Sequence, residues 1–282
     1  MRKTLRGFLR ELVVVGVIVL LAGRICAYQP GFAVSSCVSD RTAISAAQAV
    51  RRGVAANEKL DTEGIGMQIV YQLAKRSIVK VVVKDAAGSG IIWKIEDGIV
   101  IVSSKHLLMK DVKAEIVFGN GETISADVIG YSQQYDIGFV KIPDGAVTDS
   151  ILRDIYEAVP ALYEIESEEA RTAFVLEYFE KRVLQMGALS DKNTDSFSLG
   201  NIQGIRFVPL FNTHMLETAC YSKAGMSGGG VFDESGRFLG MISGGDVPED
   251  AEKREAEITY SIPSVLIAAA YEEIMYTGGR KD

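Results

Sequence analysis

The sequence predicts an all-β fold, an antiparallel barrel or sandwich, that ends in an amphipathic C-terminal helix. Short apolar runs such as "GSGIIWKI", "DGIVIVSS" and "RFLGMISG" follow one another at close spacing, with Gly, Asp or Asn between them. The composition agrees with this, because 28 Gly against 6 Pro suits strands joined by glycine turns. The last stretch, "SVLIAAAYEEIMY", has its apolar residues at helical spacing.

The start of the chain is typical of an export signal. Arg2, Lys3, Arg6 and Arg10 precede the uncharged run Leu12–Gly23. As a helix this run covers about 18 Å, less than the roughly 30 Å hydrocarbon core, so a cleaved signal and an uncleaved membrane anchor both stay open. Either one places the rest of the chain outside the cytoplasm, facing outward from the cell membrane or secreted, because positive charge stays inside. The third alternative is a buried core helix.

The stretch that follows, residues 28–62, is small and polar and is expected to form a flexible stalk. Regular secondary structure is expected from "GMQIVYQLAKRSIVKVVVKD" onward, since its first half has helical spacing and its second half has a strand pattern. Strand runs continue to "DIGFVKI" and resume with "RVLQMGAL" and "GIRFVPLF". Between these groups, "SILRDIYEAV" and "ESEEARTAFVLEYFEKR" mix helical and strand signals.

Charge and cysteine content exclude several classes of function. The formal net charge is −7 and no basic patch is visible, so we expect no nucleic-acid partner. No C-x-x-C pair or His/Cys cluster indicates a metal, and we expect no cofactor. Cys26 lies in the signal region, and the preceding "AGRI" is a poor lipoprotein box. Cys37 and Cys220 could pair in an oxidising compartment.

The segment "AGMSGGGVFD", residues 224–233, places Ser227 among four glycines. It satisfies G-x-S-x-G, the nucleophile elbow of α/β-hydrolases. That fold needs a histidine after the serine, whereas His106 and His214 both precede it, and the residues after Ser227 read as strand, turn and strand. A phosphate-binding loop is excluded because no Gly-Lys-Ser/Thr follows the glycines.

The order His, Asp, Ser remains, and it is that of a serine nucleophile with a histidine base. His214 cannot begin this order, because no aspartate lies between it and Ser227. His106 can, since it ends the strand "GIVIVSS". Among the aspartates that follow, Asp136 is best placed, at the start of the apolar strand "IGFVKI", and Asp127 is the weaker rival.

These segments resemble HtrA/Deg-type serine proteases. "GSGIIWKIEDGIVIVSSKHLL" resembles the opening of that domain up to its catalytic His, and "YDIGFVKI" resembles its D-[IL]-A-[VL]-[LI]-K segment. "AGMSGGGVFDESGRFLGMISG" resembles its G-N-S-G-G-P-L and following hairpin, and "ITYSIPSVLI" its closing [FY]-[AS]-I-P. The resemblance covers about Met67–Ile142 and Phe207–Ile267. It implies the two-barrel chymotrypsin/trypsin-like fold, with six strands in each barrel and the active site between them.

By this resemblance His106, Asp136 and Ser227 form a catalytic triad. His106 would take the proton of the Ser227 hydroxyl, and Asp136 would fix the imidazole tautomer. The backbone N–H groups of Gly225 and Ser227 would form the oxyanion hole. The sequence departs from the family at three nearby positions, with Met226 in place of Asn, Gly230 in place of Pro, and Lys105 beside His106. The family's Gly-Asn-Pro loop has no clear match in "EYFEKR".

The resemblance also places the pocket for the residue before the scissile bond at Tyr221, Met241, Ile242 and Ser243. A trypsin-like pocket has a carboxylate six residues before the serine, and Tyr221 stands there instead. We therefore expect an apolar side chain of small or medium size to bind. Asp246 is the one acid that could change this preference.

The predicted organisation is a signal or anchor over residues 1–27, the stalk over 28–62, and a protease domain over 63–282. Barrel one is expected at about 67–143 and barrel two at about 170–268, with no PDZ domain after them. The predicted function is an extracytoplasmic serine endopeptidase that acts on unfolded or damaged polypeptides and contacts the membrane through its N-terminal segment. The alternative is a catalytically weak protein of the same fold that binds peptide segments or a partner.

Overall fold

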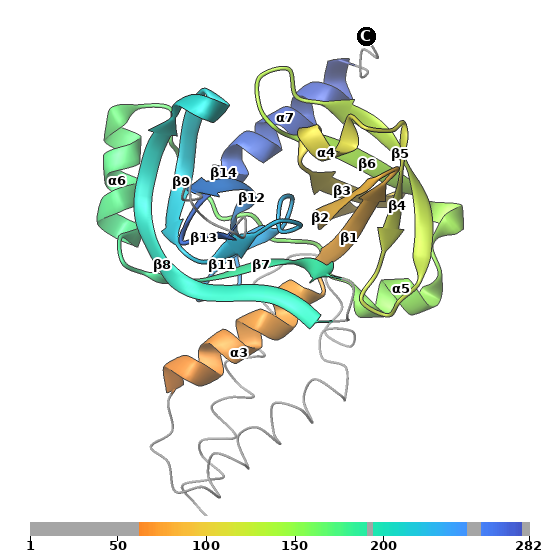
Figure 1. Cartoon of the computed structure of the whole chain (residues 1–282), viewed down its shortest axis with the longest axis horizontal. Helices are drawn as coiled ribbons and strands as arrows, with labels where there is room; N and C mark the ends of the chain where they lie inside the picture. Colours follow the sequence, from red (N-terminus) through yellow and green to blue (C-terminus); the bar gives the residue numbers. More distant parts are fainter. Residues whose placement is uncertain (1–61, 191–193, 247–254, 278–282) are drawn as a thin grey trace, which may run out of the picture. The chain divides into compact units, whose positions relative to one another are not determined.

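In the described part of the chain, the long strands close into two antiparallel barrels of six strands each (Figure 1). The structure, a computed structural model, describes residues 62–190, 194–246 and 255–277. The predicted signal or anchor, nearly all of the predicted stalk, Cys26 and Cys37 lie outside these residues. The two barrels and the terminal helices confirm the predicted fold class.

Barrel one has the strand order β1-β2-β3-β6-β5-β4, and pairing of β1 with β4 closes it. Its strands are short and apolar, and every residue of β3, "GIVIVS", is buried. The bounds are β1 Ile78–Val83, β2 Ala86–Ile95, β3 Gly98–Ser103, β4 Lys113–Val117, β5 Thr123–Tyr131 and β6 Gly138–Pro143. Inward-facing aliphatic side chains such as Val81, Ile101 and Ile116 fill the barrel. Burial of each such side chain contributes about 1.5–3 kcal/mol.

Barrel two has the order β11-β12-β14-β9-β8-β7, and pairing of β11 with β7 closes it. The bounds are β7 Arg182–Ser190, β8 Thr194–Val208, β9 Thr213–Ala219, β11 Gly230–Asp233, β12 Phe238–Asp246 and β14 Ile258–Pro263. Two short strands outside the barrel, β10 (Ser222–Lys223) and β13 (Glu255–Ala256), pair with each other. A separate core that includes Val183, Leu216 and Ile242 fills this barrel.

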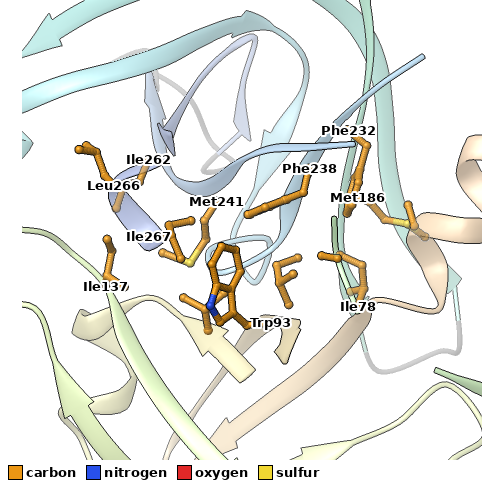
Figure 2. Close-up of a cluster of buried hydrophobic side chains, with 14 of the residues drawn as sticks. Ile78, Trp93, Ile137, Met186, Phe232, Phe238, Met241, Ile262, Leu266 and Ile267 are labelled. Carbon is orange, nitrogen blue, oxygen red and sulfur yellow. The ribbon is translucent and has the colours of Figure 1, made fainter. Parts of the chain in front are cut away.

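A third hydrophobic cluster joins the two barrels (Figure 2). Trp93 of barrel one lies among side chains of both barrels, including Ile78 and Ile137 from the first and Phe238, Met241 and Ile262 from the second. The Trp93 ring meets Phe238 edge-on, with ring centroids 6.3 Å apart. This continuous core holds the barrels as one unit, so that residues from both can build one site.

Helices cover the ends of this core. Helix α3 (Thr62–Lys75) buries Met67, Val70 and Ala74, and α7 (Ser264–Thr277) buries Leu266, Ile267, Ala270 and Ile274. Apart from the adjacent pair Leu266 and Ile267, successive buried residues are three or four positions apart, which gives one apolar face on each helix. The remaining helical segments are α4 Lys105–Leu108, η1 Asp144–Ala146, α5 Asp149–Asp154, α6 Glu168–Tyr178 and η2 Pro209–Phe211. Within the described residues, no helix is long and apolar enough to cross a membrane.

The connection between the barrels, which gave mixed signals in sequence, contains α5 and α6. Both helices begin at a side-chain cap. The Thr148 hydroxyl accepts a hydrogen bond from the Ile151 N–H at 3.2 Å, and the Ser167 hydroxyl accepts one from the Ala170 N–H at 3.0 Å. Such caps satisfy backbone donors that a helix start leaves free.

Candidate active site

His106 and Asp136 meet at one end of barrel one. His106 lies in α4, directly after β3, and Asp136 lies just before β6. Strands β3 and β6 are neighbours, with Ser103 opposite Gly138, so the residues beyond this pair come together. The His106 ring Nδ1 lies 2.8 Å from Asp136 Oδ2, and the His106 backbone N–H donates to Asp136 Oδ1, also at 2.8 Å.

A residue of barrel two completes the surroundings of this carboxylate. Ser243, on β12, donates its hydroxyl hydrogen bond to Asp136 Oδ2 at 2.6 Å. Burial favours the neutral acid, but the hydrogen bonds from the His106 ring, the Ser243 hydroxyl and the His106 amide outweigh it. The pKa of Asp136 therefore lies below its ordinary value, and the group is a carboxylate at neutral pH.

Ser227 lies in the tight loop between β10 and β11. Its backbone C=O accepts a hydrogen bond from the N–H of Ser89 on β2 at 2.8 Å, and the next N–H, that of Gly228, donates to the Ile242 C=O at 2.8 Å. Ile242 directly precedes Ser243, which binds Asp136. A short series of contacts thus links Ser227 through Ile242, Ser243 and Asp136 to His106.

The loop presents two free amides beside Ser227. Gly225 has φ +90°, in the region that favours glycine, and a Cβ there would meet nothing within 4 Å. The N–H of Met226 donates to the Lys223 C=O at 3.1 Å, and that of Gly229 to the Met226 C=O at 2.9 Å. The N–H groups of Gly225 and Ser227 donate to no acceptor among the described residues. They are available to a bound oxyanion.

This arrangement suits acyl transfer through a serine. An imidazole whose Nδ1 is held by a carboxylate leaves Nε2 as the proton acceptor. A serine hydroxyl that reaches such a base, with free amides nearby, would have the groups that nucleophilic catalysis requires. Within the described ranges, no cluster of three His, Cys, Asp or Glu side chains could hold a metal ion.

The structure gives the other residues considered in the sequence different surroundings. The rival Asp127 is exposed on β5, where its carboxylate lies 3.4 Å from the Lys113 amine. Lys105 points its amine to the Ser132 C=O at 2.8 Å. His214 packs edge-on against Phe207 on the neighbouring strand, and burial lowers its pKa.

The predicted pocket residues separate into three environments. Tyr221 is exposed beside the loop, whereas Ser243 turns its hydroxyl to Asp136. The side chain of Met241 is buried in the cluster between the barrels and that of Ile242 in the core of barrel two, so neither is exposed beside Ser227. Asp246 accepts a hydrogen bond from the Tyr260 hydroxyl at 2.8 Å.

Sequence reasoning did not find the contact of Ser243 with Asp136. The family resemblance placed Ser243 in the pocket, but no local pattern connects it with a residue 107 positions earlier. Ser89, in the quoted "GSG", was likewise not identified as a neighbour of the Ser227 loop.

Comparisons with known proteins agree with this geometry. The family model of the trypsin-like peptidase domain matches residues 88–241. Similar solved structures include the HtrA-type protease AlgW with a tripeptide, at a TM-score of 0.60 and 15% identity over 76% of this chain and 64% of that chain. An alanine variant of AlgW with a decapeptide gives a TM-score of 0.59 and 13% identity, over 75% of this chain and 67% of that one. No curated protein sequence matches significantly.

These identities show the fold alone, and the chain spans about two thirds of the length of those structures. The family model shows a trypsin-like peptidase domain, and the similar structures confirm the trypsin fold that the resemblance implied.

Proposed function

Because this chain belongs to the trypsin-like peptidase domain family, we propose that it is a serine endopeptidase whose triad is His106, Asp136 and Ser227. One observation carries the proposal: the 2.8 Å contact between His106 Nδ1 and an ionised Asp136 that Ser243 of the other barrel also holds. A histidine that only formed part of an exposed turn would not require contact with a partly buried carboxylate that the other barrel also binds.

The proposed reaction begins when the Ser227 hydroxyl attacks the carbonyl carbon of the scissile bond. His106 Nε2 takes the hydroxyl proton, and Asp136 stabilises the imidazolium. The negative charge that forms on the carbonyl oxygen is met by the N–H groups of Gly225 and Ser227. Collapse of this tetrahedral intermediate breaks the C–N bond as His106 protonates the leaving amine. A water molecule, whose proton His106 takes in turn, then hydrolyses the acyl-enzyme and releases the Ser227 hydroxyl.

The edge of β12 beside the loop suits an extended polypeptide. Its residues Gly244 and Gly245 pair with Tyr260 and Thr259 of β14, and among the described residues no strand pairs with their other edge. An extended peptide can add to such an edge through backbone hydrogen bonds. The AlgW structures hold a tripeptide and a decapeptide, which supports polypeptide substrates here too. Unfolded protein would supply such segments.

We expect cleavage after uncharged residues such as Val, Ala or Leu. Behind Tyr221, a buried network of neutral groups includes Gln185, whose amide donates to the Tyr221 C=O at 3.0 Å and to the Thr259 hydroxyl at 3.2 Å. A Lys or Arg side chain buried there would lack a partner, which is costly. A peptide library digested by the enzyme tests this, and a profile dominated by Lys or Arg would contradict it.

We also propose that the domain works outside the cytoplasm, since a basic segment precedes the apolar run Leu12–Gly23. A reporter fused after Asp282 should be exported from bacteria. Replacement of Leu12–Gly23 by polar residues should keep the reporter inside, and continued export of that variant would contradict the proposal.

Digestion of an unfolded protein tests the catalytic proposal. Purified residues 62–282, a unit that has its own continuous core, should cleave casein, and Ser227→Ala should not. The variant should keep the melting temperature within about 2 °C, because a single half-buried hydroxyl contributes little to stability. Cleavage that persists in pure Ser227→Ala would exclude Ser227. Binding of casein without cleavage by the unchanged protein would support a peptide-binding role instead.

A further inference from the structure

We propose that Ser89 is a positioning residue, which orients the backbone N–H of Ser227 for catalysis. Ser89 lies on β2 of barrel one and is fully buried. Its backbone N–H donates to the Ser227 C=O at 2.8 Å, and its hydroxyl donates to the Gly225 C=O at 2.7 Å. The inference rests on the proposed protease function.

The bonding pattern along the loop shows how this would work. The Gly225 C=O and the Met226 N–H belong to one peptide group, which Ser89 Oγ and the Lys223 C=O hold from both ends. The Ser227 C=O and the Gly228 N–H belong to another, which the Ser89 N–H and the Ile242 C=O hold. The peptide group that carries the Ser227 N–H lies between these two held groups, and its own C=O, that of Met226, accepts a hydrogen bond from the Gly229 N–H at 2.9 Å. Ser89 thus holds the groups on either side of the Ser227 N–H.

The Ser89 hydroxyl is itself oriented. It accepts a hydrogen bond from the Ala188 N–H on β7 at 2.8 Å, which leaves its own hydrogen for the Gly225 C=O. The Ser103 hydroxyl donates to the Ser89 C=O at 2.7 Å. Every hydrogen-bonding group of Ser89 is thus engaged away from water, where such bonds are stronger than in solvent. A contact from barrel one therefore sets the geometry of the loop in barrel two.

Replacement of Ser89 by Ala would leave the Gly225 C=O and the Ala188 N–H without partners. Buried unpaired groups of this kind are unfavourable, so the loop would rotate to find other partners. Loss of a single oxyanion donor lowers kcat about 10²- to 10³-fold, and a misdirected donor retains part of that effect. We therefore expect a roughly 10- to 100-fold loss in kcat.

The test compares Ser89→Ala with Ser264→Ala. Ser264 is also fully buried and donates to a backbone carbonyl, that of Ala161, at 3.2 Å, but it lies at the start of α7 and makes no contact with the loop. For each protein we would measure kcat and KM per titrated active site, and the rate of labelling by a fluorophosphonate.

Ser89→Ala should lose kcat and labelling rate by about 10- to 100-fold, the range argued above, with KM within about threefold. The pH at which kcat/KM is half-maximal should stay unchanged, because His106 and Asp136 are untouched. Ser264→Ala should keep the rates per active site. Should Ser89→Ala fail to fold, Ser89→Cys keeps a weak donor of similar size and should give intermediate rates.

Two outcomes separate this inference from the proposed function. If the unchanged protein neither cleaves casein nor reacts with the fluorophosphonate, the protease proposal fails. If the unchanged protein is active and the Ser89 variants match its kcat per active site, the protease proposal stands and the role of Ser89 is overturned. Equal rate losses in Ser89→Ala and Ser264→Ala would also overturn that role.

Discussion

Gly228→Ala should disable the Ser227 loop by forcing it away from barrel one. Gly228 has φ +86°, and an added Cβ would lie 2.0 Å from the Ser89 backbone oxygen and 2.7 Å from Ser103 Oγ. A backbone oxygen cannot rotate away as a side chain can, so the loop and β2 must separate. Three contributions lower the free energy of unfolding: backbone strain of about 1–2 kcal/mol, steric overlap of about 1–3 kcal/mol, and loss of the hydrogen bond between Ser89 and Ser227, about 0.5–1.5 kcal/mol.

Gly121→Ala is the matched control. Gly121 has φ +87°, but it lies in the turn between β4 and β5, and a Cβ there would meet nothing within 4 Å. Only the backbone strain remains, about 1–2 kcal/mol. The melting temperature of a domain of this size shifts by about 2–4 °C per kcal/mol, so Gly121→Ala should lower it by about 2–8 °C and Gly228→Ala by about 5–26 °C.

Calorimetry and fluorophosphonate labelling would be run on the two variants together. Gly121→Ala should be labelled at the rate of the unchanged protein, and Gly228→Ala should be labelled at least about a hundredfold more slowly, since the oxyanion donors move with the loop. Equal melting temperatures and equal labelling rates in the two variants would refute the reasoning.

Three further predictions concern single side chains. Asp136→Asn should lower kcat by about 10⁴-fold through the wrong imidazole tautomer, while Asp127→Asn should leave kcat unchanged; the reverse result would make Asp127 the triad residue. Because the pKa of Asp136 is lower in the folded protein than the unfolded-state value of 3.8, its ionisation stabilises the fold above that pH, and this contribution is lost as the pH falls through the lower folded value. Acid denaturation below about pH 4 should therefore be less steep in Asp136→Asn. Identical acid transitions in the two proteins would contradict this. Burial raises the pKa of the Cys220 thiol to about 11, so in the reduced protein at pH 8 iodoacetamide should alkylate Cys220 only after unfolding; peptide mapping that finds rapid alkylation of the folded protein would contradict this.

The fold was predictable where strands are apolar and local turns are clear. Strand β3 is an example, because "GIVIVS" is buried throughout and ends at the site. Strand β9, "THMLETA", was missed because its Thr, His and Glu residues dilute the pattern, although Met215 and Leu216 are fully buried. It is a strand because β8 and β14 pair with its two edges, which is information from distant sequence.

Helix α6 was ambiguous for another reason. Phe174 and Tyr178 lie four residues apart and are buried, but Leu176 and Phe179 are exposed. Apolar residues therefore occur on both faces of the segment, and no single helical stripe appears in the sequence. The fold decides which of these residues face barrel two, and their stacked rings, Phe174 on Tyr178 with centroids 4.6 Å apart, mark the buried side.

The site was predictable as far as residue order carries it. The order His, Asp, Ser selected His106 and left eight aspartates, among which local context favoured Asp136 first and Asp127 second. Contacts that cross from one barrel to the other, such as Ser243 to Asp136 and Ser89 to Gly225, join residues 107 and 136 positions apart. Only the packing of one barrel against the other creates them, so no local pattern could reveal them.

The most direct test of the proposed triad is the site of fluorophosphonate attachment. A serine reacts with this reagent only when a neighbouring base activates it, so intact residues 62–282 should carry one adduct, on Ser227, as mapped by mass spectrometry of the digested protein. His106→Ala should keep the fold by circular dichroism and lose the adduct. An unlabelled folded protein, an adduct on another serine, or undiminished labelling of His106→Ala would contradict the assignment of Ser227 as a nucleophile activated by His106.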